Sequence, residues 1–188
     1  MHREPVLRLL EDYQDRHPAE AAVVARTSEL VRARPDCFDR GCLPGHLTGS
    51  AWIVSADFRD VLLTHHRKLG RWLQLGGHAD GDPDLLRVAL REAREESGLD
   101  RFEPWAGAAG IVQLLDLDIH PIPAHGGEPG HDHHDLRFLL VAAPGQELRI
   151  SEESNDLRWV RREDLRALAD EESILRMASK AAALLERP

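Results

Sequence analysis

The segment covering residues 76–99 constrains the fold of this chain more than any other part of the sequence. It opens with a pair of glycines, and its apolar residues then recur at helical spacing. Asp82 can cap a helix, Pro83 suits a first helical position, and Gly98 suits a left-handed C-cap. The pattern predicts a helix over residues 84–97.

Three carboxylates share one flank of this predicted helix. The spacings between Glu92, Glu95 and Glu96 place them within an arc of roughly 100°. One interpretation is a solvated acidic flank offset by Arg91 and Arg94, which is the commoner outcome for such a cluster. The other is a hard-cation site, because converging oxygen ligands suit Mg²⁺ or Mn²⁺.

The spacing of the motif favours the second interpretation. The run from Arg91 to Leu99 resembles the core of the Nudix box, Arg-Glu-aliphatic-x-Glu-Glu-x-Gly-aliphatic, and Gly77 lies fourteen residues before Arg91, as that box requires. The resemblance covers residues 77–99, with Pro83 in place of the first box glutamate. It implies an α/β/α sandwich around a mixed β-sheet, and hydrolysis of a nucleoside diphosphate linked to another moiety.

The resemblance also implies roles for individual residues. Glu95 and Glu96 would bind Mg²⁺ or Mn²⁺ together with the carbonyl group of Gly77. Glu92 would bind a metal directly or through water, and would orient or deprotonate the attacking water. Arg91 would hold Glu92 by an ion pair.

Further candidate residues lie outside the box. Many family members take another acid from a later loop, where this chain has Glu152 and Glu153; we prefer Glu153, with an acidic surface loop as the alternative. Arg67 and Arg71 form a small basic group that meets substrate phosphate or lies in a solvated turn.

Histidines gather in a loop predicted over residues 120–134. Histidine is the commonest transition-metal ligand, but no spacing here matches a defined zinc motif. Three interpretations stay open: a second metal site, contact with substrate phosphate, or a polar loop. His131 and His133 are the first choices for substrate binding because they precede a predicted strand. Four further histidines are candidates to line the same site, and His78 is the best of them because it follows the glycine pair; the others are His46, His65 and His66.

The remaining pattern predicts a mixed α/β domain at residues 41–188 with an N-terminal helical extension at residues 1–40. The extension is a candidate for a homodimer interface or a lid. The other predicted helices are residues 5–34 (a pair), 162–169 and 172–186, and the predicted strands are residues 47–56, 61–65, 71–75, 108–119, 135–142 and 157–160.

Composition narrows the class of protein. The formal net charge of -9 disfavours stable nucleic-acid binding. Cys37 and Cys42 are interpreted as ordinary thiols. No apolar run approaches the length of a membrane span, and no secretory pattern opens the sequence, so we expect a soluble, cytoplasmic protein.

The expected partner is a small nucleoside diphosphate derivative. The box does not determine which nucleotide is bound, because substrate specificity resides in other loops. A catalytically weak nucleotide-binding regulatory module is the alternative, and the intact glutamates argue against it. A histidine-rich metal-binding protein with an incidental acidic helix is a third interpretation.

Overall fold

The computed structural model describes residues 2–107, 110–127, 129–152, 154–169 and 171–186. Within them, the strands form one eight-stranded sheet in the order β3-β2-β1-β7-β5, with β4 beside β1, β6 beside β7 and β8 beside β2. The strands are β1 (Gly45–Val54), β2 (Asp60–His66), β3 (Arg71–Leu73), β4 (Leu75–His78), β5 (Phe102–Pro104), β6 (Leu114–Ile122), β7 (His131–Ala142) and β8 (Ser154–Arg161).

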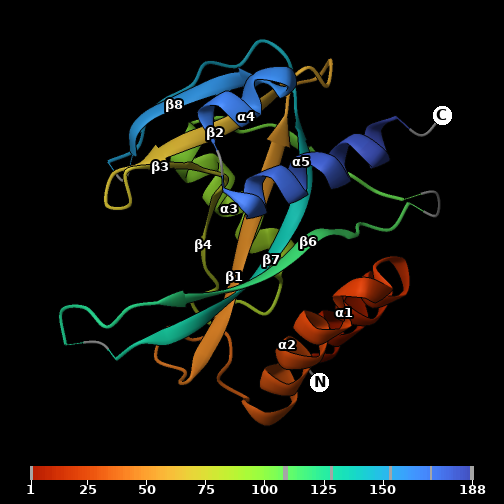
Figure 1. The fold of residues 1–188 in the computed structure, drawn as a ribbon, viewed down its shortest axis with the longest axis vertical. Coiled ribbons are helices and arrows are strands. Elements are labelled where there is room, and N and C mark those ends of the chain that lie inside the picture. The colour runs from red at the N-terminus through yellow and green to blue at the C-terminus, as the bar shows by residue number, and fades with distance from the viewer. Residues whose placement is uncertain (1, 108–109, 128, 153, 170, 187–188) are drawn as a thin grey trace.

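The helices lie on both sides of this sheet (Figure 1). They are α1 (Glu4–Arg16), α2 (Ala21–Ala33), α3 (Leu85–Ser97), α4 (Leu165–Leu168) and α5 (Glu172–Leu185), with 3-10 turns at Pro18–Glu20 and Arg162–Asp164. Only the pairing of β1 with β7 is parallel among the described strand pairs, so the sheet is mixed. The predicted α/β/α architecture and the N-terminal helices are confirmed.

Alternation along β1 separates the two cores. Leu47 and Ile53 point into the core that contains α3, whereas Trp52 and Val54 point into the core that contains α5. A side chain at Gly49 would come within 2.7 Å of the Leu85 carbonyl oxygen, so α3 packs directly on the backbone of β1. This close approach fixes the height of α3 above the sheet.

The two N-terminal helices pack beside β6 and share the α3-side core through residues such as Leu10 (Figure 1). Polar contacts add to this packing. The Tyr13 hydroxyl accepts hydrogen bonds from the Leu117 amide at 3.2 Å and from Lys180 Nζ at 2.5 Å. The extension is therefore joined to both β6 and α5.

The ends of α3 follow from its sequence, with one correction. Gly98 takes the predicted left-handed conformation with φ of 71°. The N-cap, however, is Asp84, whose carboxylate accepts the Arg87 amide at 3.1 Å. Asp82 instead accepts the Asp84 amide at 2.9 Å and Arg87 Nε at 2.6 Å, so it braces the turn before the helix. Pro83 lies in that turn.

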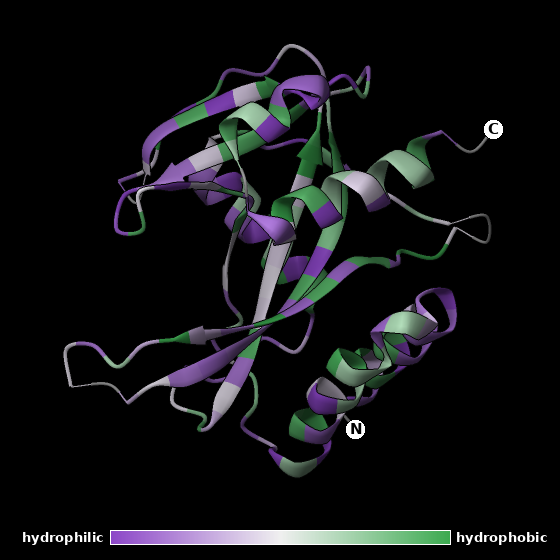
Figure 2. Cartoon of the chain, viewed as in Figure 1, coloured by the Kyte–Doolittle hydropathy of each residue, from purple (hydrophilic) through white to green (hydrophobic). Residues whose placement is uncertain are grey.

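The predicted histidine loop is wrong at both ends. β6 continues to Ile122 and β7 begins at His131, so strands replace both ends of the loop that we predicted over residues 120–134. Polar residues follow one another there, and they give no apolar period from which a strand could be recognised. Figure 2 shows hydrophilic colour on the first part of β7. Residues 108–109 of the predicted strand 108–119 lie outside the described residues, and within the described part β6 begins at Leu114.

The two cysteines lie in the interior of the protein. Cys37 and Cys42 are buried free thiols, as interpreted from the sequence. Among the described residues, no helix combines the length and apolar character that crossing a membrane requires.

Candidate active site and histidine cluster

The carboxylate of Glu92 fills the space beneath Gly77. A Cβ atom at Gly77 would lie 2.6 Å from Glu92 Cδ, so β4 can pass over this carboxylate only because residue 77 is glycine. The Glu92 side chain is 13% exposed, which is low for a glutamate. The glycine and the glutamate, fifteen residues apart in sequence, therefore form one cradle.

Arg91 connects this cradle to its surroundings. Its Nη1 lies 2.7 Å from Glu92 Oε1 and 3.4 Å from Glu95 Oε2. Its Nη2 donates to the His78 carbonyl oxygen at 2.8 Å. The guanidinium thus offsets two negative charges and also ties α3 to the end of β4.

The donor set suits a hard divalent cation. Glu95 is 61% exposed, and Glu96 is half-buried one position further along α3. Carboxylate oxygens and a backbone carbonyl are the ligands that Mg²⁺ prefers. The room that Gly77 leaves for a carboxylate agrees with such a site, so the residues present fit a bound Mg²⁺ or Mn²⁺.

A second group of side chains gathers on β1, β4, β6 and β7. The His46 ring lies 5.1 Å from His78, 4.8 Å from His131 and 4.8 Å from His133, between ring centroids. His120 joins on the other side, 5.4 Å from His133. The structure thus brings together three predicted substrate-binding histidines, and it adds His46 at the centre.

Strand register produces this histidine cluster, which we define as His46, His78, His120, His131 and His133. His46 pairs with His133 in the parallel β1–β7 ladder, and His120 pairs with His133 in the antiparallel β6–β7 ladder. Residues paired across strands point to the same face. The sequence made His46 only a secondary candidate for this site, ranked below His78, because the pairing of distant strands cannot be read from spacing.

Burial keeps several of these imidazoles neutral. Burial, followed by the charge of Arg40, lowers the pKa of His78 to about 4. Burial, followed by the neighbouring His78, lowers the pKa of His133 to about 2. Burial also lowers the pKa of His46, against a smaller opposing effect of the Cys42 backbone. At pH 7 their ring nitrogens can therefore accept a hydrogen bond or bind a metal.

A buried ionic network continues along the same strands. Arg137 Nε donates to Asp135 Oδ2 at 2.7 Å, and its Nη1 donates to Asp116 Oδ2 at 3.0 Å. Arg176 Nε donates to Asp116 Oδ1 at 2.9 Å, and Arg176 also pairs with Asp118 at 2.7 Å. We did not predict this network. Its signal is that Asp116 and Asp118 in β6, and Asp135 and Arg137 in β7, stand two residues apart with an apolar residue between them.

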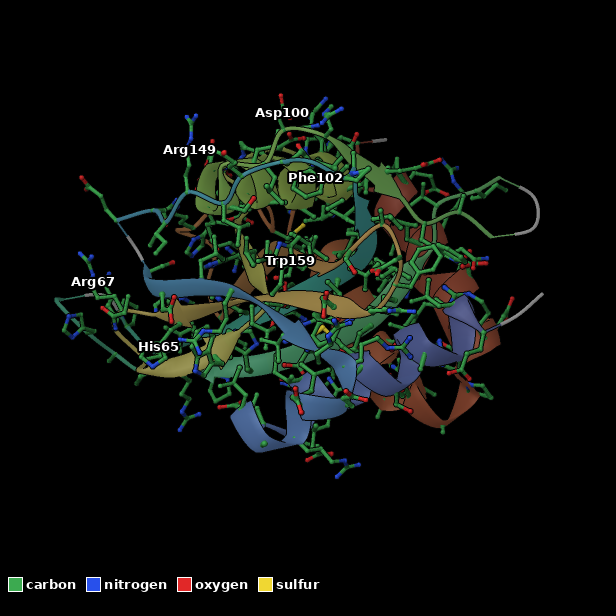
Figure 3. The ribbon with its side chains drawn as sticks, turned by 90° about the horizontal axis from the view of Figure 1, so that it is seen from above. His65, Arg67, Asp100, Phe102, Arg149 and Trp159 are labelled. Atoms are coloured by element: carbon green, nitrogen blue, oxygen red, sulfur yellow. The ribbon has the colours of Figure 1, made fainter. Side chains whose placement is uncertain are left out.

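The predicted basic group lies elsewhere. Figure 3 shows Arg67 beside His65 at one end of the molecule, in the β2–β3 turn. Arg67 Nη2 approaches the Ser154 carbonyl oxygen at 3.5 Å, and Arg71 forms an ion pair with Glu171 before α5. Both arginines therefore stand apart from the histidine cluster.

The acid predicted from a later loop is placed only in part by the structure. Glu153, our preferred candidate, lies outside the described residues. Its neighbour Glu152 is exposed, in the turn before β8. Among the described residues, the candidate active site is therefore built from β4 and α3.

Comparisons with known proteins agree with this arrangement. The sequence model of the NUDIX domain matches residues 46–180, and a comparison with curated proteins gave no match. A hydrolase of the NUDIX family from Clostridium perfringens is 28% identical, with a TM-score of 0.58 over 75% of this chain and 98% of that chain.

Two more distant structures show the same fold. An Ap4A hydrolase from C. elegans, in a binary complex, is 18% identical, with a TM-score of 0.59 over 74% of this chain and 96% of that chain. The NUDIX domain of Shewanella oneidensis NrtR, complexed with ADP ribose, is 19% identical, with a TM-score of 0.51 over 85% of this chain and 97% of that chain.

Proposed function

The chain belongs to the Nudix family, and from this membership we propose that it hydrolyses the diphosphate linkage of a nucleoside diphosphate joined to another moiety. The observation that carries the proposal is the Gly77–Glu92 cradle. Gly77 leaves room for the mostly buried carboxylate of Glu92, and Arg91 pairs with that carboxylate. Burying a charged group costs free energy, so this arrangement is not expected on a helix flank that only faces solvent.

The proposed metal ligands are Glu95, Glu96 and the Gly77 carbonyl group, with Glu92 as a direct or water-mediated ligand. When bound there, Mg²⁺ or Mn²⁺ would neutralise phosphate oxygens and lower the pKa of an attacking water. These ligands come from α3 and from β4, which packs against it, so their relative positions are set by the fold.

The proposed reaction is attack of water on one phosphorus atom of the linkage. A new phosphorus–oxygen bond forms, the bridging phosphorus–oxygen bond breaks, and two products with terminal phosphates result. Glu92 accepts the proton of the water. Arg91, which contacts Glu92 Oε1, positions that carboxylate, so its role is to orient Glu92 and not to bind substrate.

The substrate class is proposed from chemistry and from similar proteins. Ap4A and ADP ribose, named with two of the similar structures, both contain a phosphate anhydride linkage that joins a nucleoside to another moiety. A nucleoside diphosphate derivative is therefore the class to test first. The protein's net charge of -9 makes charge neutralisation by a cation a natural requirement for such an anionic substrate.

The test is a panel of nucleoside diphosphate derivatives assayed with Mg²⁺ or Mn²⁺ in ¹⁸O-labelled water. We expect metal-dependent cleavage and one labelled oxygen in a product phosphate. Glu96→Gln should lower turnover by about 100-fold or more, because one charged ligand becomes neutral. Glu103→Gln, on an exposed position of β5, is the matched control and should retain wild-type turnover.

Two outcomes would contradict the proposal. Near-normal turnover of Glu96→Gln would show that the proposed metal ligands on α3 are not needed for the reaction. Tight nucleotide binding without turnover on any substrate of the panel would favour the alternative, a nucleotide-binding regulatory module.

A further inference from the structure

We propose that His46, His131 and His133 bind a first-row transition-metal ion such as Zn²⁺, as a donor set separate from the carboxylates of α3. Each residue offers one ring nitrogen, and these three nitrogens all lie within 4.8 Å of one another. The proposal adds a second metal, of a different chemical class, to a protein whose proposed catalysis uses Mg²⁺ or Mn²⁺.

His46 provides the strongest evidence. It is 1% exposed, and within the described part of the chain neither of its ring nitrogens makes a hydrogen bond of normal geometry, although a backbone group of Cys42 lies near the ring. His133 Nε2 is likewise buried without a partner there. Buried polar atoms are nearly always satisfied, and leaving one unpaired costs free energy. A metal ion bound by both rings would satisfy one nitrogen of each.

The spacing of the nitrogens fits coordination after small movements. Zinc–nitrogen bonds of about 2.0–2.1 Å require tetrahedral ligand atoms about 3.4 Å apart. The three nitrogens lie within 4.8 Å of one another, so binding an ion requires them to approach one another further, and we expect side-chain rotation to supply this movement. His131 Nδ1 already lies 3.0 Å from the Pro129 carbonyl oxygen, which orients the ring and leaves Nε2 as its ligand atom.

The backbone makes the set rigid. His46 and His133 are register partners on β1 and β7, and His131 lies two residues earlier on β7, so all three project from the same sheet face. Sites built on strands hold their geometry better than sites built on loops. The pairing of β1 with β7 therefore determines which histidines lie close together, even without a bound metal.

The surrounding rings define the rest of the site. His78 lies 5.1 Å from His46 and 4.9 Å from His133, between centroids, and so borders the fourth coordination position. His120 flanks His133, and its Nδ1 is 3.3 Å from Asp118 Oδ2. Imidazole donors suit Zn²⁺, Co²⁺ and Ni²⁺, whereas Mg²⁺ prefers oxygen, so the two donor sets select different ions.

The experiment uses the full chain without a polyhistidine tag, stripped of metal by a chelator and titrated with Co²⁺ in the presence of excess Mg²⁺. We expect one Co²⁺ per chain, with the intense visible bands of four-coordinate Co²⁺, and competition by Zn²⁺. His131→Ala and His133→Ala should each weaken Co²⁺ binding by about 100-fold or more. This is a larger loss of affinity than is usual when a residue that only orients a metal ligand is removed.

Two control variants distinguish the histidine donor set from exposed histidines and from the carboxylates of α3. His125→Ala removes an exposed histidine of the β6–β7 connection, outside the cluster, and should bind Co²⁺ as the wild type does. Glu96→Gln should also retain Co²⁺ binding, because it alters only the carboxylate set. Circular dichroism checks folding, and the half-buried His131 gives the variant that least disturbs the core.

The proposal is overturned if the wild type gives no four-coordinate Co²⁺ spectrum, or if binding survives in both His131→Ala and His133→Ala. Loss of Co²⁺ binding in Glu96→Gln would also overturn it, by assigning the ion to the carboxylates. None of these outcomes depends on hydrolysis, so failure here and failure of the proposed function are distinguishable.

Discussion

Arg91 donates a hydrogen bond to the carbonyl oxygen of His78 at 2.8 Å. The same guanidinium lies 2.7 Å from Glu92, while the ring of His78 packs against His46 on the neighbouring strand. One residue of β4 therefore touches both groups of functional side chains: its backbone faces the carboxylates of α3, and its imidazole faces the histidine cluster.

Replacing Arg91 by alanine should lower kcat by about 10–100-fold, the usual effect of losing a partner that orients a ligand. The physical reason is that Glu92 loses its positioning contact and β4 loses its tie to α3. Arg94→Ala on the same helix, where the side chain contacts the Asp100 carbonyl oxygen, is the control. Steady-state kinetics measure both variants. Equal rates for the two would show that Arg91 does not position Glu92.

Gly77→Ala should reduce kcat/KM strongly while the protein remains folded. The added Cβ would lie 2.6 Å from Glu92 Cδ, so the carboxylate must move out of its cradle. Gly41→Ala is the matched control, because a Cβ there meets no atom within 4 Å. Kinetics and thermal melting compare the two variants. A fully active Gly77→Ala protein would show that the cradle is not needed for catalysis.

Arg137→Met should destabilise the protein by about 3–5 kcal/mol, the usual cost of removing one partner from a buried ion pair. The loss removes the cation that is paired with Asp135 inside the sheet, while Asp116 keeps its contacts with Arg176 and Lys180. Urea unfolding at pH 7 measures the effect. Arg59→Met, at a side chain that is 72% exposed, should change the unfolding midpoint little. Similar midpoints for both variants would contradict the network's role.

Stability should fall in acid through the same network. Burial alone raises the pKa of the Asp118 carboxyl, but the hydrogen bond with His120 and the charges of Arg137 and Arg176 outweigh it and hold the pKa below the ordinary 3.8. The pKa of Asp116 is lowered in the same way. The unfolded chain therefore takes up protons at a higher pH than the folded chain does. The stabilisation is complete well above pH 3.8 and is lost progressively as pH falls from there to the folded-state pKa values.

Urea midpoints measured between about pH 5 and pH 3, a range that brackets the carboxyl pKa of the unfolded chain, check this expectation. Asp118→Asn should flatten the dependence, because the variant has one titrating carboxyl fewer. An unchanged acid dependence in Asp118→Asn would assign the effect to other carboxylates.

The helix that carries the glutamates could be predicted closely from the sequence. Apolar periodicity, an acidic N-cap and a C-cap glycine agree over one continuous stretch, so the predicted 84–97 differs from the observed Leu85–Ser97 by one residue. The error lay in the cap itself. Asp82 and Asp84 are both suitable by residue type, and only the backbone decides which carboxylate meets the Arg87 amide.

The histidine cluster could be predicted only in part. His131 and His133 drew attention by their density in the sequence, but His46 lies 85 residues before His131 and enters through the parallel β1–β7 register. Parallel pairing joins segments that no local pattern relates. The contact of Arg137 with Asp116 was missed for the same reason. The sequence shows a charged residue within each strand, but it does not show which residue of the other strand lies opposite.

The contact of Tyr13 with Leu117 has a consequence for the behaviour of the whole molecule. Among the described strands β6 pairs only with β7, and on its other side α1 supplies partners: the Tyr13 hydroxyl for the Leu117 amide, and Arg16 for the Leu114 carbonyl oxygen at 3.1 Å. An uncovered strand edge is a template for pairing with another chain. The N-terminal helix thus shields the β6 edge of the sheet from pairing with a strand of another chain. A chain that begins after α2 would leave this edge exposed and more prone to association.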